Sequence, residues 1–377
     1  MKPGDAVIAG IGHTAFGAHP GRSTVSLNVE AIRAALADAR IEKDAVDALF
    51  LKFPTSQFTF QYGQKVAEAV GLQPRIGGVW DAAGAANIAM ISFAALAIEA
   101  GQCEVAVVAF ADNPKTGARQ GLVKSNGPDD VFGWVGPVGG YAMIARRHME
   151  QWGTTHDQLG AVAVNARRNA LANPHAQLRK PLSLEDYRNS KPVVAPLMRD
   201  DCCLVSDGGA AVVVTSAAHA KSLGVPAPVP ILGFGQGQTS WNVELRPDLT
   251  STMAATSART AFAMAGLTPA DIDVAQFYDC FTIVPLITLE DYGFCAPGRG
   301  GAFVEHEGIG LDGALPLNTA GGLLAESGMP GMQLVIEGVR QMRGIAASQV
   351  AGARTCMVSN QGGIMHTHSS LILGAAS

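Results

Sequence analysis

Apolar and polar positions in the first 112 residues alternate between two patterns. Short runs of apolar and β-branched residues are typical of buried strands, and the segments between them repeat apolar residues every three or four positions, as helices do. These patterns predict strands at 6–12, 46–53, 75–80 and 104–112 and helices at 23–41, 64–72 and 84–100. Because strands separated by helices form βαβ units, we expect an α/β protein with a mainly parallel sheet.

The helix predicted at 84–100 differs from the others because it is apolar on nearly all of its faces. At that length, such a pattern predicts a helix buried inside the protein. The turn that leads into it, WDAAGAAN at residues 80–87, contains only Ala, Gly, Asp and Asn after its Trp. The turn therefore carries no nucleophilic side chain.

Residues 113–200 interrupt the alternation. Pro, Gly, Asn and Arg cluster there, and two amphipathic helices are predicted at 141–153 and 156–174. A strand pattern returns at 208–217, which we expect to rejoin the first sheet. Residues 113–200 are therefore predicted to be a loop domain inserted into the first half of the chain.

The rest of the chain repeats the order of the first part. Strands are predicted at 228–237, 271–279, 354–359 and 369–375, and helices at 250–266, 281–292 and 329–344. A Gly-rich turn, a long helix, a Gly and a strand follow one another at 84–112 and again at 321–360, which indicates internal duplication. We expect two halves, 1–225 with its insertion and 226–377.

Composition and charge narrow the class of protein. The chain is 48% hydrophobic and 16% charged, which suits a large core, and its formal net charge of −5 with scattered basic residues gives no footprint for nucleic acid. The six cysteines form neither a CxxC pair nor a metal-binding spacing, so we expect reduced thiols, no metal site and a cytoplasmic protein. The N-terminus has no signal-peptide pattern, and no apolar run approaches the roughly 20 residues of a membrane span.

Five motifs stand out, and they are spread over nearly the whole chain. In sequence order they are VIAGIGHTAFG, GPVGGYAMIARRHMEQWG, CCLVSDGGAAVVVTSAAHA, FYDCFTIVPLITLEDYGFC and LNTAGGLLAESGMPGMQLVIEGVRQMRG. Together they resemble the thiolase superfamily, in particular its lipid-transfer and sterol-carrier-type branch. The resemblance implies a five-layered αβαβα fold of two similar halves. Each half would contribute a five-stranded sheet, two buried helices would lie between the sheets, and the protein would form a homodimer.

The resemblance also implies where the reactive groups of a thiolase would lie. The nucleophilic Cys at the start of the first buried helix corresponds to Gly84 or Ala85, and the His of an HDCF motif corresponds to Tyr278. The GHP-type motif has no His and reads ESGMPG at 326–331, and the second Cys corresponds to Ser359 or Asn360. The Gly362-Gly363 pair is retained.

A thiolase needs a Cys to accept the acyl group and a second acid or base, so we do not expect a covalent acyl-enzyme. The retained groups suit retro-aldol cleavage of a β-hydroxyacyl-CoA, which needs a base for the hydroxyl proton and donors for the enolate oxygen. This sequence resembles Cys-less steroid side-chain aldolases of the branch in its YDCF motif. It departs from them at Gly328, where an aromatic residue is expected.

Tyr278 is the first candidate, as a hydrogen-bond donor or as the base. His366 and His368 would share one face of an extended segment beside the Gly pair, so one of them is predicted to face the site. Backbone N–H groups of Gly84, Ala85, Gly362 and Gly363 are candidate substrate-binding donors, and the resemblance adds Asn318 as a substrate-binding residue. Asp279 is predicted to cap a helix rather than to act as a base.

Three functions remain open at this point. The first is an acyl-CoA aldolase that acts on a bulky lipid or steroid chain. The second is a degenerate thiolase-like or lipid-transfer subunit, and the third is an acetyl-CoA acyltransferase that uses another residue or a partner. We expect no bound cofactor, acyl-CoA as the substrate and, from the resemblance, a small OB-fold zinc-ribbon protein as a possible partner.

Overall fold

The protein was analysed as a computed structural model that describes residues 2–57, 59–117 and 136–376. Nine strands form one sheet in the order β3-β2-β4-β7-β1-β8-β11-β10-β9. They are β1 (Ala6–His13), β2 (Ala48–Lys52), β3 (Ile76–Trp80), β4 (Val105–Asp112), β7 (Gly208–Ser216), β8 (Val229–Gln238), β9 (Val274–Gln276), β10 (Thr355–Gly362) and β11 (Thr367–Gly374). Every strand predicted from the sequence is present.

The sheet divides into two similar halves. The first half has the order β3-β2-β4-β7-β1, and the second has the mirrored order β8-β11-β10-β9, with a single bridge from Ala275 to Leu317 at the position of a fifth strand. The expected fifth strand of the second half is thus reduced to one bridge. The halves join through β1 and β8 by two residue pairs, Val7 with Pro230 and Ile8 with Val229.

The expectation of a mainly parallel sheet was wrong, because most neighbouring strands pair antiparallel. Only β2–β3, β2–β4 and β9–β10 pair in parallel, and the remaining neighbours in the nine-stranded sheet are antiparallel. The reason is that β7 and β11 each run against the other strands of their half from the middle of the sheet. β11 follows β10 through a tight turn, and β7 returns from the inserted segment instead of from a crossover helix.

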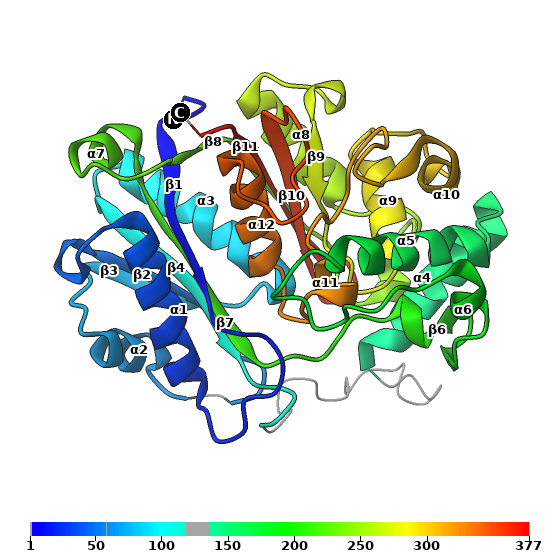
Figure 1. Cartoon of the computed structure of the whole chain (residues 1–377), viewed down its shortest axis with the longest axis horizontal. Coiled ribbons are helices and arrows are strands. Elements are labelled where there is room, and N and C mark those ends of the chain that lie inside the picture. Colours follow the sequence, from blue (N-terminus) through cyan, green and yellow to red (C-terminus); the bar gives the residue numbers. More distant parts are fainter. Residues whose placement is uncertain (1, 58, 118–135, 377) are drawn as a thin grey trace.

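Helices cover both faces of each half and also lie between them (Figure 1). α1 (Thr24–Ala39) and α2 (Tyr62–Val70) pack on the outer face of the first half, and α8 (Ala254–Ala265) packs on β8 and β11 of the second. α3 (Ala86–Glu99) and α12 (Met332–Arg343) contact strands of both halves and each other. This gives the predicted five layers, with α3 and α12 in the middle one.

The inserted segment and the linkers supply the remaining elements. The segment contains the two predicted amphipathic helices, α4 (Gly136–Trp152) and α5 (His156–Ala170), and the short elements α6 (Leu184–Arg188), β5 (Pro192–Val194) and β6 (Leu197–Met198). The other helices are α7 (Ala217–Ser222), α9 (Ile283–Asp291), α10 (Gly300–Ala302) and α11 (Gly322–Ala325). α4 and α5 lie on the side of the second half, beside α9 and α10 (Figure 1). The domain boundaries drawn from the sequence stay a prediction.

The α3 helix is buried as predicted, except along one stripe. Most of its residues are buried, but Phe93 and Leu96 are 36% and 46% exposed. Phe93 packs against Trp80 at the end of β3, with ring centroids 5.0 Å apart. No helix in the described part of the chain is long and apolar enough to cross a membrane.

Candidate active site at the start of α3

Gly84 lies in a short 3₁₀ turn, Ala83–Ala85, that leads into α3. A Cβ atom added at Gly84 would lie 2.5 Å from the Tyr278 hydroxyl oxygen and would also clash with the Gln361 carbonyl oxygen. A side chain at this position is therefore incompatible with the packing around it. The residues aligned by resemblance, Gly84 and Tyr278, are direct neighbours in space.

The backbone around Tyr278 is fixed by side chains from three other elements. Tyr278 follows the end of β9, and its N–H donates to the Ser359 hydroxyl of β10 at 3.1 Å. The Asn318 amide accepts from the N–H of Phe277 at 2.7 Å and donates to its carbonyl at 2.9 Å. Asn318 thus uses its amide to hold the strand end that presents Tyr278.

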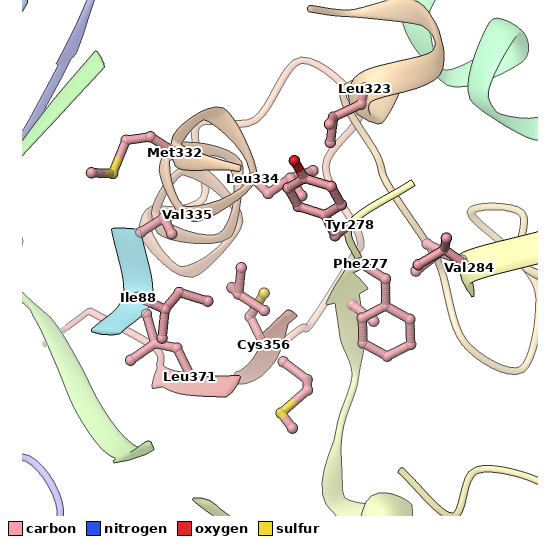
Figure 2. Packing of buried hydrophobic residues seen from close by; sticks show 14 of the residues in the cluster. Ile88, Phe277, Tyr278, Val284, Leu323, Met332, Leu334, Val335, Cys356 and Leu371 are labelled. Atoms are coloured by element: carbon pink, nitrogen blue, oxygen red, sulfur yellow. The ribbon is translucent and has the colours of Figure 1, made fainter. Parts of the chain in front are cut away.

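Tyr278 and its neighbour Phe277 point in different directions from this strand end (Figure 2). Phe277 packs edge-on against Tyr292, with ring centroids 5.2 Å apart, whereas the Tyr278 ring is directed away from Phe277 and belongs to the same buried cluster as Leu323 and Leu334 (Figure 2). The Tyr278 hydroxyl has no hydrogen-bond partner among the residues that the structure describes. Burial raises the pKa of Tyr278 well above its usual value, so the group is a neutral phenol at pH 7. A neutral phenol can donate a hydrogen bond but is a very weak base.

The turn between β10 and β11 packs directly on the turn before α3. A Cβ atom at Gly362 would clash with the Ala82 carbonyl, and the Thr367 hydroxyl donates to the same carbonyl at 3.1 Å. Gly84 and Gly362, which lie far apart in sequence, are therefore brought together. Both glycines are required by the close approach of backbone rather than by a turn geometry.

Backbone donors at this contact are partly used and partly free. The Ala85 N–H donates to the Ala82 carbonyl at 3.1 Å, so it is occupied within the turn. The N–H groups of Gly84 and Gly363 donate to no atom of the described residues. Of the four backbone donors suggested by the sequence, those of Gly84 and Gly363 thus have no acceptor within residues 2–57, 59–117 and 136–376.

His366 lies in the β10–β11 turn, beside Gly363. Its Nδ1 accepts from the Ile364 N–H at 2.8 Å, and the Trp241 ring stacks on the imidazole with centroids 5.1 Å apart. Burial, together with the nearby Arg246, lowers the pKa of His366 to about 4. Because Nδ1 is an acceptor, the proton of the neutral ring is on Nε2, which leaves no free lone pair for a base.

His368 shares a face with Ser370, and that face packs toward α8 and α9. Its Nε2 lies 2.9 Å from the Tyr292 hydroxyl, which also bonds Ser370, and burial lowers the pKa of His368 to about 3. The intervening residue Ser369 points the other way and donates to the Ala85 carbonyl at 2.7 Å. The structure therefore brings Tyr278, Gly84, Gly362 and Gly363 together, with His366 at the side, and does not bring His368 to Gly84.

None of the six thiols is activated. Burial raises the pKa of every cysteine above its usual value, to about 11 for Cys103 and about 12 for Cys202, Cys203 and Cys295, and well above it for Cys280 and Cys356. Cys280, the cysteine closest in sequence to Tyr278, accepts a hydrogen bond from the Gln361 amide at 3.0 Å. A thiol with a raised pKa is a poor nucleophile, because the thiolate is the reactive form.

The two remaining motif positions have structural roles. Asp279 was predicted to cap the apolar helix that follows it; instead it accepts from the N–H of Leu323 at 2.7 Å, in the first turn of α11. A Cβ atom at Gly328 would clash with the Leu204 carbonyl. The Leu204 backbone thus occupies the space that an aromatic side chain at position 328 would need.

A hollow of about 580 Å³ opens next to these motifs. Its lining includes Cys203, Leu204 and Leu324, and the Cys203 N–H donates to the Cys280 carbonyl at 2.9 Å; Gly84, Tyr278 and Gly363 do not line it. Arg167 of α5 and Arg199 also line it. Within the described ranges, no group of three or more His, Cys, Asp or Glu residues could hold a metal ion.

Sequence reasoning missed Tyr141, Gln361 and Arg246. The Tyr141 hydroxyl donates to the Gly363 carbonyl at 2.8 Å and accepts from the Gln361 amide. Arg246 donates to the Ile364 carbonyl. Tyr141 lies within a motif quoted above and Gln361 directly precedes the Gly362-Gly363 pair, but no local pattern marks Arg246, which comes from an irregular segment between β8 and α8.

Comparisons with known proteins identify the family of the chain. The family model described as "Thiolase C-terminal domain-like" matches residues 235–375. The chain is 38% identical to a 17-hydroxy-3-oxo-4-pregnene-20-carboxyl-CoA lyase of Mycobacterium tuberculosis, over 99% of this chain and 100% of that protein. It is 36% identical to a steroid side-chain-cleaving aldolase of Thermomonospora curvata, over 100% of this chain and 99% of the other. A solved structure titled "Ltp2-ChsH2(DUF35) aldolase" matches 100% of this chain and 99% of its own, with a TM-score of 0.91 and 35% identity.

Proposed function

The chain belongs to the thiolase superfamily, and on that premise we propose that it is an acyl-CoA lyase that cleaves a carbon–carbon bond by a retro-aldol reaction, without a cysteine nucleophile. Its full-length relatives are named as a CoA lyase and a steroid side-chain-cleaving aldolase. The substrate proposed is accordingly a β-hydroxyacyl-CoA with a steroid or other bulky lipid side chain. The products would be a ketone or aldehyde and a shortened acyl-CoA.

The observation that carries the proposal is the packing at Gly84. A thiolase-type acyl transfer needs a nucleophilic side chain where this chain has a glycine pressed against the Tyr278 hydroxyl. A retro-aldol cleavage needs no such side chain. It needs hydrogen-bond donors where negative charge develops on the thioester oxygen.

Tyr278 and two backbone N–H groups are proposed as those donors. In the cleavage, a base removes the β-hydroxyl proton, the bond between the α and β carbons breaks, and its electron pair moves onto the thioester carbonyl as an enolate. The Gly84 and Gly363 N–H groups and the neutral Tyr278 phenol are free to donate to that oxygen. Protonation of the α carbon then releases the shortened acyl-CoA.

The hollow beside Cys203 and Leu204 is proposed to receive the substrate. Its volume of about 580 Å³ falls in the range of ligand sites, roughly 300–1,000 Å³. Arg167 and Arg199 also line it, each paired with Asp200 at 3.8 and 3.0 Å, and we propose that phosphate groups of CoA compete with Asp200 for them. Cys203 in this lining is hydrogen-bonded through its N–H to the carbonyl of Cys280, two residues after Tyr278.

Two partners are proposed, each from a different observation. A second copy of the chain would cover the apolar surface formed by Val79, Phe93 and Leu96, which lies at β3, the outermost strand of the first half. A small partner protein of the OB-fold, zinc-ribbon class is proposed because the matched aldolase structure is titled as a complex of two components. Neither partner changes the assignment of Tyr278.

The test is the turnover of a steroid side-chain β-hydroxyacyl-CoA by the wild-type protein, alone and with a co-expressed candidate partner. Release of the ketone is the expected result, and Tyr278→Phe should lower kcat about 100-fold or more, as the loss of an oxyanion donor does. Tyr292→Phe is the matched control, because it removes a buried phenol that bonds His368 and Ser370.

Each of the alternatives has a distinct outcome in this assay. Acyl transfer that is lost on thiol alkylation would support an acyltransferase. Binding of the acyl-CoA without cleavage by any complex would support a degenerate subunit. Unchanged turnover by Tyr278→Phe would remove Tyr278 from the mechanism and leave the lyase assignment standing.

A further inference from the structure

Arg246 is the most unusual charged residue of the described chain. It is 8% exposed, and its Nη2 donates to the Ile364 carbonyl in the β10–β11 turn. Its Nε and Nη1 are buried and have no hydrogen-bond partner within residues 2–57, 59–117 and 136–376. No carboxylate of those residues forms an ion pair with it.

A second arginine shows what a satisfied guanidinium looks like in this protein. Arg343 pairs with Asp38 at 2.7 Å and donates to the carbonyls of Ala9 and Ala227. Arginine stays protonated in proteins, and a buried charge without a partner is costly. The cost at Arg246 therefore calls for a compensating role at its location.

That location is the turn that carries the free Gly363 N–H. Three successive carbonyls of the turn are each held by a donor: Gly362 by the His366 N–H, Gly363 by the Tyr141 hydroxyl and Ile364 by Arg246. With the carbonyls fixed, the Gly363 N–H remains as the free donor of the turn. Arg246 and Tyr141 thus determine how this N–H is presented.

We propose that Arg246 is a positioning residue for the enolate, which fixes the Gly363 turn through the Ile364 carbonyl and supplies, beside the developing negative charge, a positive charge that no carboxylate of the described residues pairs. This rests on the proposed function, because it needs a thioester oxygen at Gly363. In a buried site, a fixed charge acts on a developing charge more strongly than it does in water.

His366 and Trp241 complete the surroundings of this charge. The imidazole of His366 packs in the same turn, is neutral, and is covered by the stacked Trp241 ring. The Trp241 carbonyl lies near this imidazole, although His366 Nε2 forms no hydrogen bond of ordinary geometry. Neither neighbour carries a negative charge that would neutralise Arg246.

The test uses acetoacetyl-CoA, whose α proton dissociates to the buffer and leaves an enolate with a distinctive ultraviolet absorbance. The apparent pKa of the bound thioester is measured for the wild type, Arg246→Met, Arg246→Lys and Tyr141→Phe. Arg259→Met, which removes an exposed arginine of α8, is the matched control for net charge.

The wild type is expected to lower the apparent pKa of the bound thioester below its value in solution. Arg246→Met should weaken this effect at least about tenfold and lower kcat of the cleavage roughly 10- to 100-fold with little change in KM, less than a direct oxyanion donor costs. Arg246→Lys, which keeps the charge, should fall between the two, and Tyr141→Phe should lose positioning but keep the charge. Arg259→Met should match the wild type.

Three results would overturn the inference. The first is an enolate shift in Arg246→Met equal to that of the wild type. The second is a large loss of thermal stability in both Arg246 variants with kcat per folded protein unchanged, which would indicate a structural role. The third is a wild type that binds acetoacetyl-CoA without any shift, which would also overturn the proposed function.

Discussion

Replacing Gly84 by Ala tests whether the turn before α3 is as tightly packed as described. The added methyl group would lie 2.5 Å from the Tyr278 hydroxyl oxygen and 2.7 Å from its Cζ, and it would clash with the Gln361 carbonyl. A side chain can move, but a backbone carbonyl at the end of a central strand cannot move cheaply. Overpacking of this kind costs about 1–3 kcal/mol, and we expect Gly84→Ala to lose about 2 kcal/mol of unfolding free energy.

The sign of the effect makes this prediction sharp. Replacing a glycine at a helix start by Ala without strain usually stabilises the protein, by up to about 1 kcal/mol. Gly63 in α2 provides that control, because its nearest neighbour to an added Cβ is a Val79 methyl group at a comfortable 3.7 Å. Gly63→Ala should therefore be neutral or stabilising while Gly84→Ala destabilises.

A double-mutant cycle identifies the partner in the clash. Tyr278→Phe removes the 2.5 Å contact but leaves Cζ and the Gln361 carbonyl in place, so it should recover only part of the loss, about 0.5–1 kcal/mol. The measurement is urea unfolding of the four proteins, followed by fluorescence, with lyase activity assayed in parallel. A Gly84→Ala protein as stable as Gly63→Ala, with full activity, would refute the packing argument and the location of the site.

Other predictions follow from groups near this site. Burial raises the pKa of Glu326 to about 8, so the folded state favours the protonated acid. As the pH rises from 4.5 to 8, the free energy of unfolding of the wild type should therefore fall by about 1.4 kcal/mol per pH unit relative to that of Glu326→Gln. Parallel curves of stability against pH for the two proteins would contradict this. Asn318→Ala removes the partner of both backbone groups of Phe277. It should lower kcat while changing KM less, and it should reduce the free energy of unfolding by about 1–3 kcal/mol, as measured by kinetics and urea unfolding. Iodoacetamide at pH 7 should label the folded protein slowly and leave cleavage intact, as followed by mass spectrometry, since all six thiols have raised pKa values; rapid labelling with loss of cleavage would revive a thiol mechanism.

The sequence predicted the elements well because their signal is local. Apolar runs and helical spacing located every strand of the main sheet and the buried helix, since these segments are buried where their pattern says they are. Strand direction at β7 and β11 was not predicted, because it depends on how the chain returns from the insertion and from a four-residue turn. Direction is a property of the path and not of the strand.

The site was predicted in part for a similar reason. Tyr278 and Gly84 were found through motif positions, and their contact across about 200 residues confirms that those positions meet. Asn318 was expected to bind substrate, which stays a prediction; in the structure its amide bonds both backbone groups of Phe277. Arg246 could not be found, because its significance comes from its burial without an acidic partner among the described residues, and only the packed structure shows that.

The joint between the two halves has a consequence for how activity would be lost. Gly84 comes from the first half, whereas Tyr278 and Gly363 come from the second, and the sheet is continuous across the joint through two residue pairs between β1 and β8, with α3 and α12 packed on both halves. A slight rotation of one half against the other would separate the donors before any strand unfolds. Mild denaturant should therefore abolish catalysis ahead of the loss of secondary structure, and a chain cut between β7 and β8 should regain activity only when both fragments reassociate.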